Sequence, residues 1–123
     1  MSPETQHTLL IAGRAILGAP FVIGGIRHCF HFPHLAQAIA GRGVPAAGFV
    51  LFLGTALQIF AGAALMLGLY PLWTGAALIV FTVAASVMLL NFWSLQGAER
   101  ISAVNAWWAN ISIIGGLLVV AAQ

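Results

Sequence analysis

Charged side chains are almost absent from the long central part of this chain. Between Thr8 and Ala122 only five positions carry a charge, and four of them lie at the edges of apolar runs: Arg27, Arg42, Glu99 and Arg100. The fifth, Arg14, lies inside the first apolar run, and none of the runs contains an acidic residue that could pair with it. Soluble domains carry about 25% charged residues, whereas this chain carries 5%. A water-facing surface cannot be built from such a composition, so the sequence predicts an integral membrane protein.

Four apolar runs divide the 123 residues. A helix needs about 20 apolar residues to cross a bilayer, and the runs cover roughly residues 8–26, 46–69, 72–93 and 103–122. They are continuous and do not alternate with a period of two, which excludes a transmembrane β-barrel. We therefore expect an all-α fold, an integral membrane four-helix bundle that forms one transmembrane domain over residues 1–123.

The connections carry their own signals. The stretch from Pro33 to Gly41 is too short to span and predicts a short interfacial helix between spans 1 and 2. Its apolar side would be formed by Leu35, Ala36, Ile39 and Ala40. Tyr70-Pro71 predicts a tight hairpin between spans 2 and 3, because proline ends one helix and opens the next.

Other features of the composition exclude several classes of protein. The net charge of +2 is too small and too scattered for nucleic-acid binding. A single cysteine, Cys29, excludes an internal disulfide framework. The N-terminal residues 1–7 lack the basic region of a signal peptide, so the first run is expected to be a retained span.

The distribution of arginines predicts an orientation. Four spans place both termini and the Tyr70-Pro71 turn on one side, and Arg27, Arg42 and Arg100 on the other. The positive-inside rule assigns the arginine-rich side to the cytoplasm. Both termini are then expected outside the cytoplasm, and the Ala- and Gly-rich composition favours a bacterial inner membrane.

Small and polar residues recur along one side of each span, as they do where membrane helices pack together. In the fourth span they are Ser102, Asn105, Ala109, Ser112 and Gly116. In the second they are Gly54, Gln58, Ala61, Ala64 and Gly68, in the third Gly75, Thr82 and Ser86, and in the first Gly18, Gly24 and Gly25. We expect these stripes to face inward and to form a compact bundle with little internal space.

Gln58 lies near the middle of its span, so its amide must find a partner inside the protein. One interpretation is an interhelical hydrogen bond to Asn110, Ser86 or Thr82, and another is a bound polar ligand such as a quinone head group. Asn91 lies closer to the membrane interface, where it can cap its helix.

Arg14 lies about one and a half turns into the first predicted span, roughly 8 Å below the membrane boundary. Its guanidinium can snorkel to lipid phosphates over that distance. It can instead pair with a carboxylate or ligand of another subunit, or take part in catalysis.

Three evenly spaced histidines, His28, His31 and His34, surround Cys29. Imidazole and thiolate are ligands of zinc, copper and haem iron, but Pro33 interrupts the helical spacing and no second cluster supplies further ligands. We favour interfacial histidines that exchange protons or contact phosphates, and no metal site or bis-histidine haem.

Taken in order, several of these features resemble the DoxX family of small four-span bacterial membrane proteins, over about residues 14–122. The residues that carry the resemblance are Arg14, Gly24-Gly25-Ile26-Arg27, Gly43-Val44-Pro45, Ala61-Gly62 through Gly68, Asn91-Phe92-Trp93, and Asn110 with Gly115-Gly116.

The resemblance implies a four-helix membrane bundle. Some members of the family resemble subunits of thiosulfate:quinone oxidoreductase, and others are tied to membrane redox homeostasis or work beside partner proteins. Members commonly have a glutamate where this chain has Gln58, and often a histidine where it has Asn91. Loss of both ionisable groups removes a proton-handling or metal-binding pair.

We therefore expect no catalytic residue in this chain, and a non-catalytic accessory subunit of a larger, redox-linked membrane complex as the leading hypothesis. Its expected partners are the lipid bilayer and other membrane subunits. The alternatives are a quinone-linked oxidoreductase subunit and a small transporter or channel. The candidate residues for binding a ligand or a partner are Arg14, Gln58, Asn91 and Asn110, with a quinone or a lipid as the ligand considered.

Overall fold

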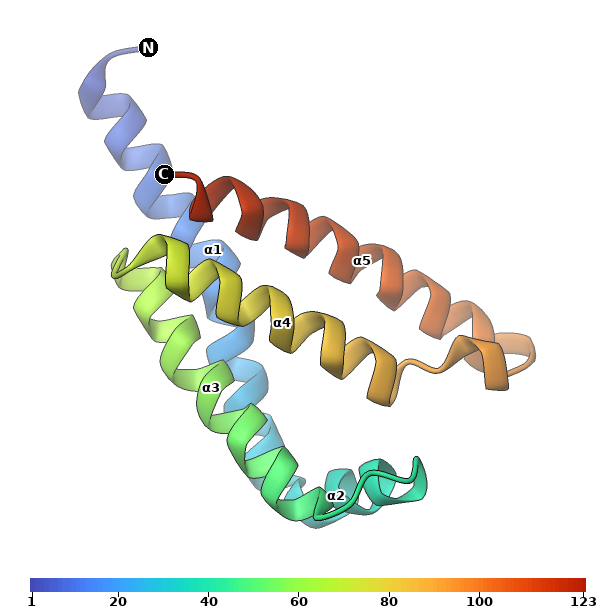
Figure 1. The fold of residues 1–123 in the computed structure, drawn as a ribbon. Helices are drawn as coiled ribbons and strands as arrows, with labels where there is room; N and C mark the ends of the chain where they lie inside the picture. The colour runs from blue at the N-terminus through green and yellow to red at the C-terminus, as the bar shows by residue number, and fades with distance from the viewer.

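The computed structural model describes residues 1–123 and is entirely helical. Its elements are α1 (Pro3–Phe30), α2 (Phe32–Gly41), α3 (Ala47–Leu67), α4 (Pro71–Leu89), the 3-10 turn η1 (Phe92–Ser94) and α5 (Gly97–Ala121), shown in Figure 1. By length and composition, α1, α3, α4 together with η1, and α5 can each cross a membrane. The prediction of four spans with a short helix between the first two is confirmed.

The first helix is longer than its predicted range of residues 8–26 at both ends. The Oγ atom of Ser2 accepts a hydrogen bond of 3.2 Å from the Thr5 N–H. Pro3 and Glu4 follow in the first turn, where a fixed φ and a negative charge both favour helix initiation. The polar N-terminal residues thus continue the helix beyond the apolar run.

The third span ends as an α-helix at Leu89, although its apolar run continues to residue 93. Arg42, which follows α2, donates a hydrogen bond of 2.9 Å to the carbonyl of Met88. The indole N–H of Trp107 on α5 donates to the carbonyl of Leu90. Because these side chains satisfy carbonyls at the helix end, the backbone can leave the helix and form η1.

The four spans associate as two antiparallel pairs, α1 with α3 and α4 with α5, which the contact between α3 and α4 connects. Figure 1 shows the two pairs crossing at an angle and diverging toward α2. Both termini lie at the end of the molecule that carries the α3–α4 turn. The expectation of a compact bundle with little internal space is therefore wrong, since the pairs leave cavities and a groove between them.

Close helix approach within each pair depends on glycine. A Cβ atom on Gly18 would lie 2.8 Å from the carbonyl oxygen of Gly62, so α1 and α3 touch through their backbones. A Cβ atom on Gly75 of α4 would lie 3.0 Å from the carbonyl oxygen of Leu117 on α5. In α1, α3 and α4 the predicted small-residue stripes face other helices and are buried or half-buried.

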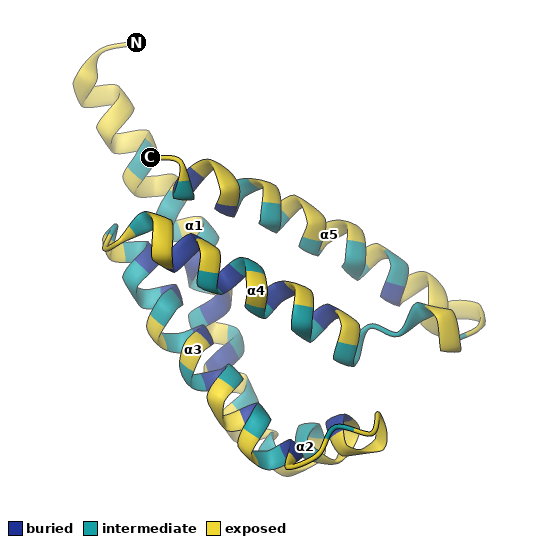
Figure 2. Ribbon diagram, in the orientation of Figure 1, coloured by how far each residue is buried: buried dark blue, intermediate teal, exposed yellow.

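The fifth helix departs from this pattern. Its predicted inward stripe is exposed at four of five positions: Ser102, Asn105, Ala109 and Ser112 (Figure 2). The face that packs on α4 carries Trp107, which bonds the end of α4, and Asn110 and Leu117. These residues have specific partners on α4 and therefore decide which side of α5 turns inward.

The buried apolar residues form two groups. The larger group joins all four spans and consists of Phe21, Leu65, Leu78, Leu117 and Val120. The smaller group holds α2 against α3 and consists of Ile39, Ala47 and Leu51. Only 18 of 123 residues are buried, and large apolar side chains cover the outside, as expected of helices that face lipid.

Candidate functional site

The side chain of Gln58 occupies the centre of the bundle and is 5% exposed. Its amide nitrogen packs on α1, where a Cβ atom on Gly24 would lie 2.7 Å from Nε2. Its carbonyl oxygen Oε1 is buried and has no hydrogen-bond partner. The imidazole of His28, one turn further along α1, lies near the Gln58 side chain, and no hydrogen bond of standard geometry joins it to Oε1. Gly24 thus provides the space for the amide, and Oε1 is left unsatisfied.

A central cavity of about 180 Å³ lies beside this amide. It is lined by residues of all four spans: Pro20, Phe21, Gln58, Phe81, Thr82, Ala85, Asn110 and Ile113. The fold therefore brings together two of the candidate residues, Gln58 and Asn110, which are far apart in the sequence.

Asn110 provides the hydrogen bond between spans that was expected of Gln58. Its Nδ2 donates a hydrogen bond of 2.8 Å to Oγ of Ser86 on α4. The Ser86 hydroxyl in turn donates to the carbonyl of Thr82, and the Thr82 hydroxyl donates to the carbonyl of Leu78, each at 2.7 Å. Thr82 and Ser86 direct their hydrogen atoms to their own helix, so neither donates to Gln58. The expected hydrogen bond from Gln58 to these side chains is not made.

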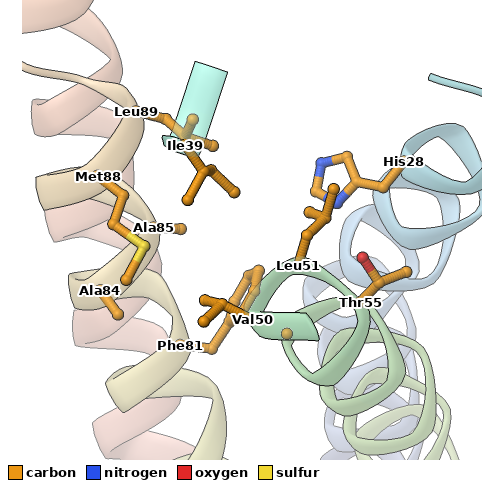
Figure 3. Close-up of a pocket in the computed structure, with 11 residues that line it drawn as sticks. His28, Ile39, Val50, Leu51, Thr55, Phe81, Ala84, Ala85, Met88 and Leu89 are labelled. Atoms are coloured by element: carbon orange, nitrogen blue, oxygen red, sulfur yellow. The ribbon is translucent and has the colours of Figure 1, made fainter. Parts of the chain in front are cut away.

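A second cavity, of about 90 Å³, lies toward α2. Figure 3 shows His28 and Thr55 on the side formed by α1 and α3, opposite Met88 and Leu89 of α4. The hydroxyl oxygen of Thr55 is buried and has no hydrogen-bond partner. Phe81 and Ala85 line both the central and the second cavity. The two cavities are therefore neighbours that share part of their walls.

Two unsatisfied polar atoms on one face of α3, Gln58 Oε1 and Thr55 Oγ1, thus belong to residues that line these cavities. Eight of the 11 residues around the second cavity and four of the eight around the central cavity are hydrophobic. Leaving a buried polar group without a partner costs about 1–3 kcal/mol. A molecule with a polar head and an apolar body could hydrogen-bond to such atoms and pack against the apolar walls of these cavities. Thr55 is not among the residues expected from the sequence, although its position three residues before Gln58 places it on the same face of a helix.

Arg14 lies against the C-terminal end of α3. A Cβ atom on Gly68, which caps that helix, would lie 2.9 Å from the guanidinium carbon of Arg14. The last carbonyls of a helix carry partial negative charge, which favours a cation at this place. Arg14 is thus level with the C-terminal end of α3.

Asn91 lies apart from Gln58, outside the residues that line the central cavity. It precedes η1, and its side chain makes no capping hydrogen bond. Its backbone carbonyl accepts a hydrogen bond of 2.9 Å from the Ser94 N–H. The expectation that its side chain caps the helix is wrong, because α4 is capped at Leu90, whose backbone N–H donates to the Ser86 carbonyl.

The three histidines are not brought together. His28 is half-buried beside the second cavity, whereas His31 and His34 are exposed at the end of α1 and the start of α2. No group of three or more His, Cys, Asp or Glu side chains is arranged to hold a metal ion.

Comparison with known proteins supplies the family. Inner membrane protein YphA of Escherichia coli (strain K12) is 23% identical to this chain over 116 residues, which cover 94% of this chain and 83% of that protein. No solved structure gives a significant match. The sequence pattern of the DoxX family matches residues 9–91, which include α2, α3, α4 and most of α1, with Arg14, Gln58 and Asn91. Because this match covers more than half of the chain, the protein belongs to the DoxX family of multi-pass membrane proteins.

Proposed function

We propose that this protein binds the head group of a membrane quinone in the cavity beside Gln58 and is a quinone-linked subunit of a redox assembly in a bacterial inner membrane. The observation that carries the proposal is that Gln58, whose buried Oε1 has no hydrogen-bond partner, lines a cavity to which all four spans contribute. The link to redox chemistry comes from the resemblance to the DoxX family.

The size and polarity of the cavity restrict the ligand. Pockets for drug-sized ligands measure about 300–1,000 Å³, so a cavity of about 180 Å³ suits a single substituted ring. Because Oε1 can only accept a hydrogen bond, it would pair with a hydroxyl group of the reduced quinone. The apolar tail would pass between α3 and α4 along Phe81 toward the second cavity and the lipid.

The residues beside the ring suit binding more than chemistry. Gln58 and Asn110 are neutral amides, and neither exchanges protons near neutral pH. They would hold the head group while a partner subunit supplies the electron acceptor or donor.

The test replaces Gln58 by methionine, which has nearly the same length and no polar head. The protein is purified in mild detergent, and the quinone that remains bound is quantified by extraction and mass spectrometry. Loss of one hydrogen bond is expected to lower the bound fraction about two- to tenfold. Asn105→Met is the matched control, because Asn105 is exposed on α5 and lies away from both cavities.

The stability of the variant distinguishes loss of a ligand from loss of the fold. Without quinone, Gln58→Met is expected to raise the free energy of unfolding by about 1 kcal/mol, because it removes an unsatisfied buried oxygen. If Gln58→Met and wild-type protein retain equal amounts of quinone, or if neither retains any, the binding proposal is wrong.

A second candidate function is the non-catalytic accessory subunit of a larger membrane complex. The exposed stripe of α5 favours it, since small and polar residues on a membrane helix are typical of contacts with another helix. Ala109 lies in this stripe, whereas Gly115 is exposed on another side of the same helix.

A pair of matched substitutions tests this candidate. Ala109→Leu is expected to reduce the amount of other membrane subunits that co-purify with the protein, because it widens the contact face. Gly115→Leu adds similar bulk where a Cβ atom meets nothing within 4 Å, and should leave co-purification unchanged. Equal recovery with both variants would eliminate this face as the contact site.

The proposed orientation places both termini outside the cytoplasm. Support comes from the gathering of positive charge at the opposite end, where Arg42 lies 5.6 Å from the Trp93 ring and Arg100 lies 5.8 Å from the Phe92 ring. A C-terminal reporter enzyme that is active only outside the cytoplasm should therefore be active. An inactive reporter, with a fluorescent cytoplasmic reporter active in its place, would reverse the orientation.

A further inference from the structure

We infer that the groove between α1 and α5 holds one anionic phospholipid, with its phosphate on Arg14 and an acyl chain between the two helices. The groove measures about 570 Å³ and lies at the end of the molecule that carries both termini. It is lined mostly by apolar side chains, and Arg14 is the one lining residue with a charged side chain.

The charge of Arg14 is not neutralised by any acidic side chain of this protein. The two acidic residues are Glu4 and Glu99. Glu4 lies ten residues before Arg14 on the same helix, about 15 Å away along the axis, and Glu99 lies at the opposite end of α5. The Nε atom of Arg14 is buried and has no hydrogen-bond partner. No acidic side chain of the protein therefore balances this charge, which favours an anion bound from outside the chain.

The height of Arg14 matches that of lipid phosphates. Its guanidinium lies against Gly68, where α3 ends and the chain turns toward α4. Tyr70 and Trp73 follow this turn and are highly exposed, at 75% and 72%. Tyrosine and tryptophan gather at the headgroup level of membrane proteins. Arg14 is therefore placed at the boundary between headgroups and hydrocarbon.

The groove below Arg14 has the form of a chain-binding site. From Arg14 to Pro20 it follows α1 for about 9 Å, which is more than half of the roughly 15 Å of hydrocarbon in one leaflet. Gly13 and Gly116 line it, and a Cβ atom on Gly13 would meet nothing within 4 Å. The absence of side chains at these positions keeps the groove open.

Charge complementarity selects the class of lipid. A phosphodiester accepts hydrogen bonds from a guanidinium in a bidentate manner. The ammonium group of a zwitterionic lipid would find no acidic side chain along this groove. An anionic lipid such as phosphatidylglycerol is therefore preferred to phosphatidylcholine.

The experiment measures which lipid stays with the protein. Purified protein is reconstituted into vesicles with equal amounts of phosphatidylglycerol and phosphatidylcholine and extracted in mild detergent. The retained lipids are then identified by native mass spectrometry. We expect wild-type protein to retain one phosphatidylglycerol. Arg14→Leu should lower the ratio of phosphatidylglycerol to phosphatidylcholine about fivefold, which corresponds to about 1 kcal/mol for one arginine near the membrane surface.

A second variant tests the groove while leaving Arg14 in place. Gly13→Leu puts a side chain into the groove and should reduce the retention of both lipids. Gly115→Leu adds the same bulk outside the groove and should behave as wild type. If Arg14→Leu does not fold, Gly13→Leu still tests whether the groove binds a lipid.

Three results would overturn the inference. The first is equal retention of the two lipids by wild-type protein, and the second is an unchanged lipid ratio in Arg14→Leu. The third is undiminished lipid in Gly13→Leu. Retention of a quinone or a second copy of the chain in place of the lipid would assign the groove to that occupant.

Discussion

The close approach of the α1 and α3 backbones makes a sharp prediction for Gly18. In Gly18→Ala, the added methyl group would lie 2.7 Å from Cγ of Met66 and 2.8 Å from the carbonyl oxygen of Gly62. Carbon atoms make favourable contact at about 3.5–4.0 Å. The Met66 side chain can move aside, but the Gly62 carbonyl can move only with the backbone of α3.

The expected loss of stability follows from this geometry. Overpacking a tight contact lowers the stability by about 1–3 kcal/mol. The higher helix propensity of alanine than of glycine raises it by at most about 1 kcal/mol. Gly13→Ala is the matched control on the same helix, because its added Cβ atom would meet nothing within 4 Å. The free energy of unfolding of Gly18→Ala should therefore lie about 1–3 kcal/mol below that of Gly13→Ala.

Titration with a denaturing detergent, followed by tryptophan fluorescence, measures both variants in the same micelles. The control corrects for helix propensity, so the difference between the variants reports the contact between α1 and α3. Equal stabilities would refute the close approach of Gly18 and Gly62. A loss confined to Gly13→Ala would show that α1 presents another face to α3.

Two further substitutions test the ends of helices. Gly68→Ala should lower the free energy of unfolding by at least about 1–2 kcal/mol, because Gly68 has a φ of +73° and its Cβ atom would contact Arg14. In the same denaturation assay, adding Arg14→Leu should recover only part of this loss, and complete recovery would contradict the backbone strain. Arg42→Ala should cost about 1–2 kcal/mol, since it removes the hydrogen bond to the Met88 carbonyl and the contact with Trp93. Arg27→Ala, at another exposed arginine, is its control, and equal effects would deny Arg42 a capping role.

The sequence predicted the number and type of elements because hydropathy and proline placement act locally. The short helix was expected from Pro33 and observed from Phe32, and the turn at Tyr70-Pro71 was expected and observed. The end of α4 could not be predicted from its own residues. It depends on Arg42 and Trp107, which reach it from α2 and α5.

The residues of the candidate site could be predicted from the sequence, but their hydrogen-bond partners could not. A glutamine in the middle of an apolar span indicates an interior position, and Gln58 is buried. Which side chain satisfies it depends on the angle between the two helix pairs. In the folded protein Asn110 bonds to Ser86, and the Gln58 amide lies against Gly24 near His28.

By itself, the sequence determined that this chain crosses the membrane four times. Four long apolar runs with so few charges cannot face water, so their surface must face lipid. It also fixed that Arg14 has no acidic partner within the spans. The tertiary structure decided which side of α5 packs on α4 and where Arg14 lies relative to a helix end. Both depend on contacts between helices far apart in the chain, since a stripe of small residues can pack on a neighbouring span or remain outside. Packing of Trp107 and Leu117 on α4 settled that choice here.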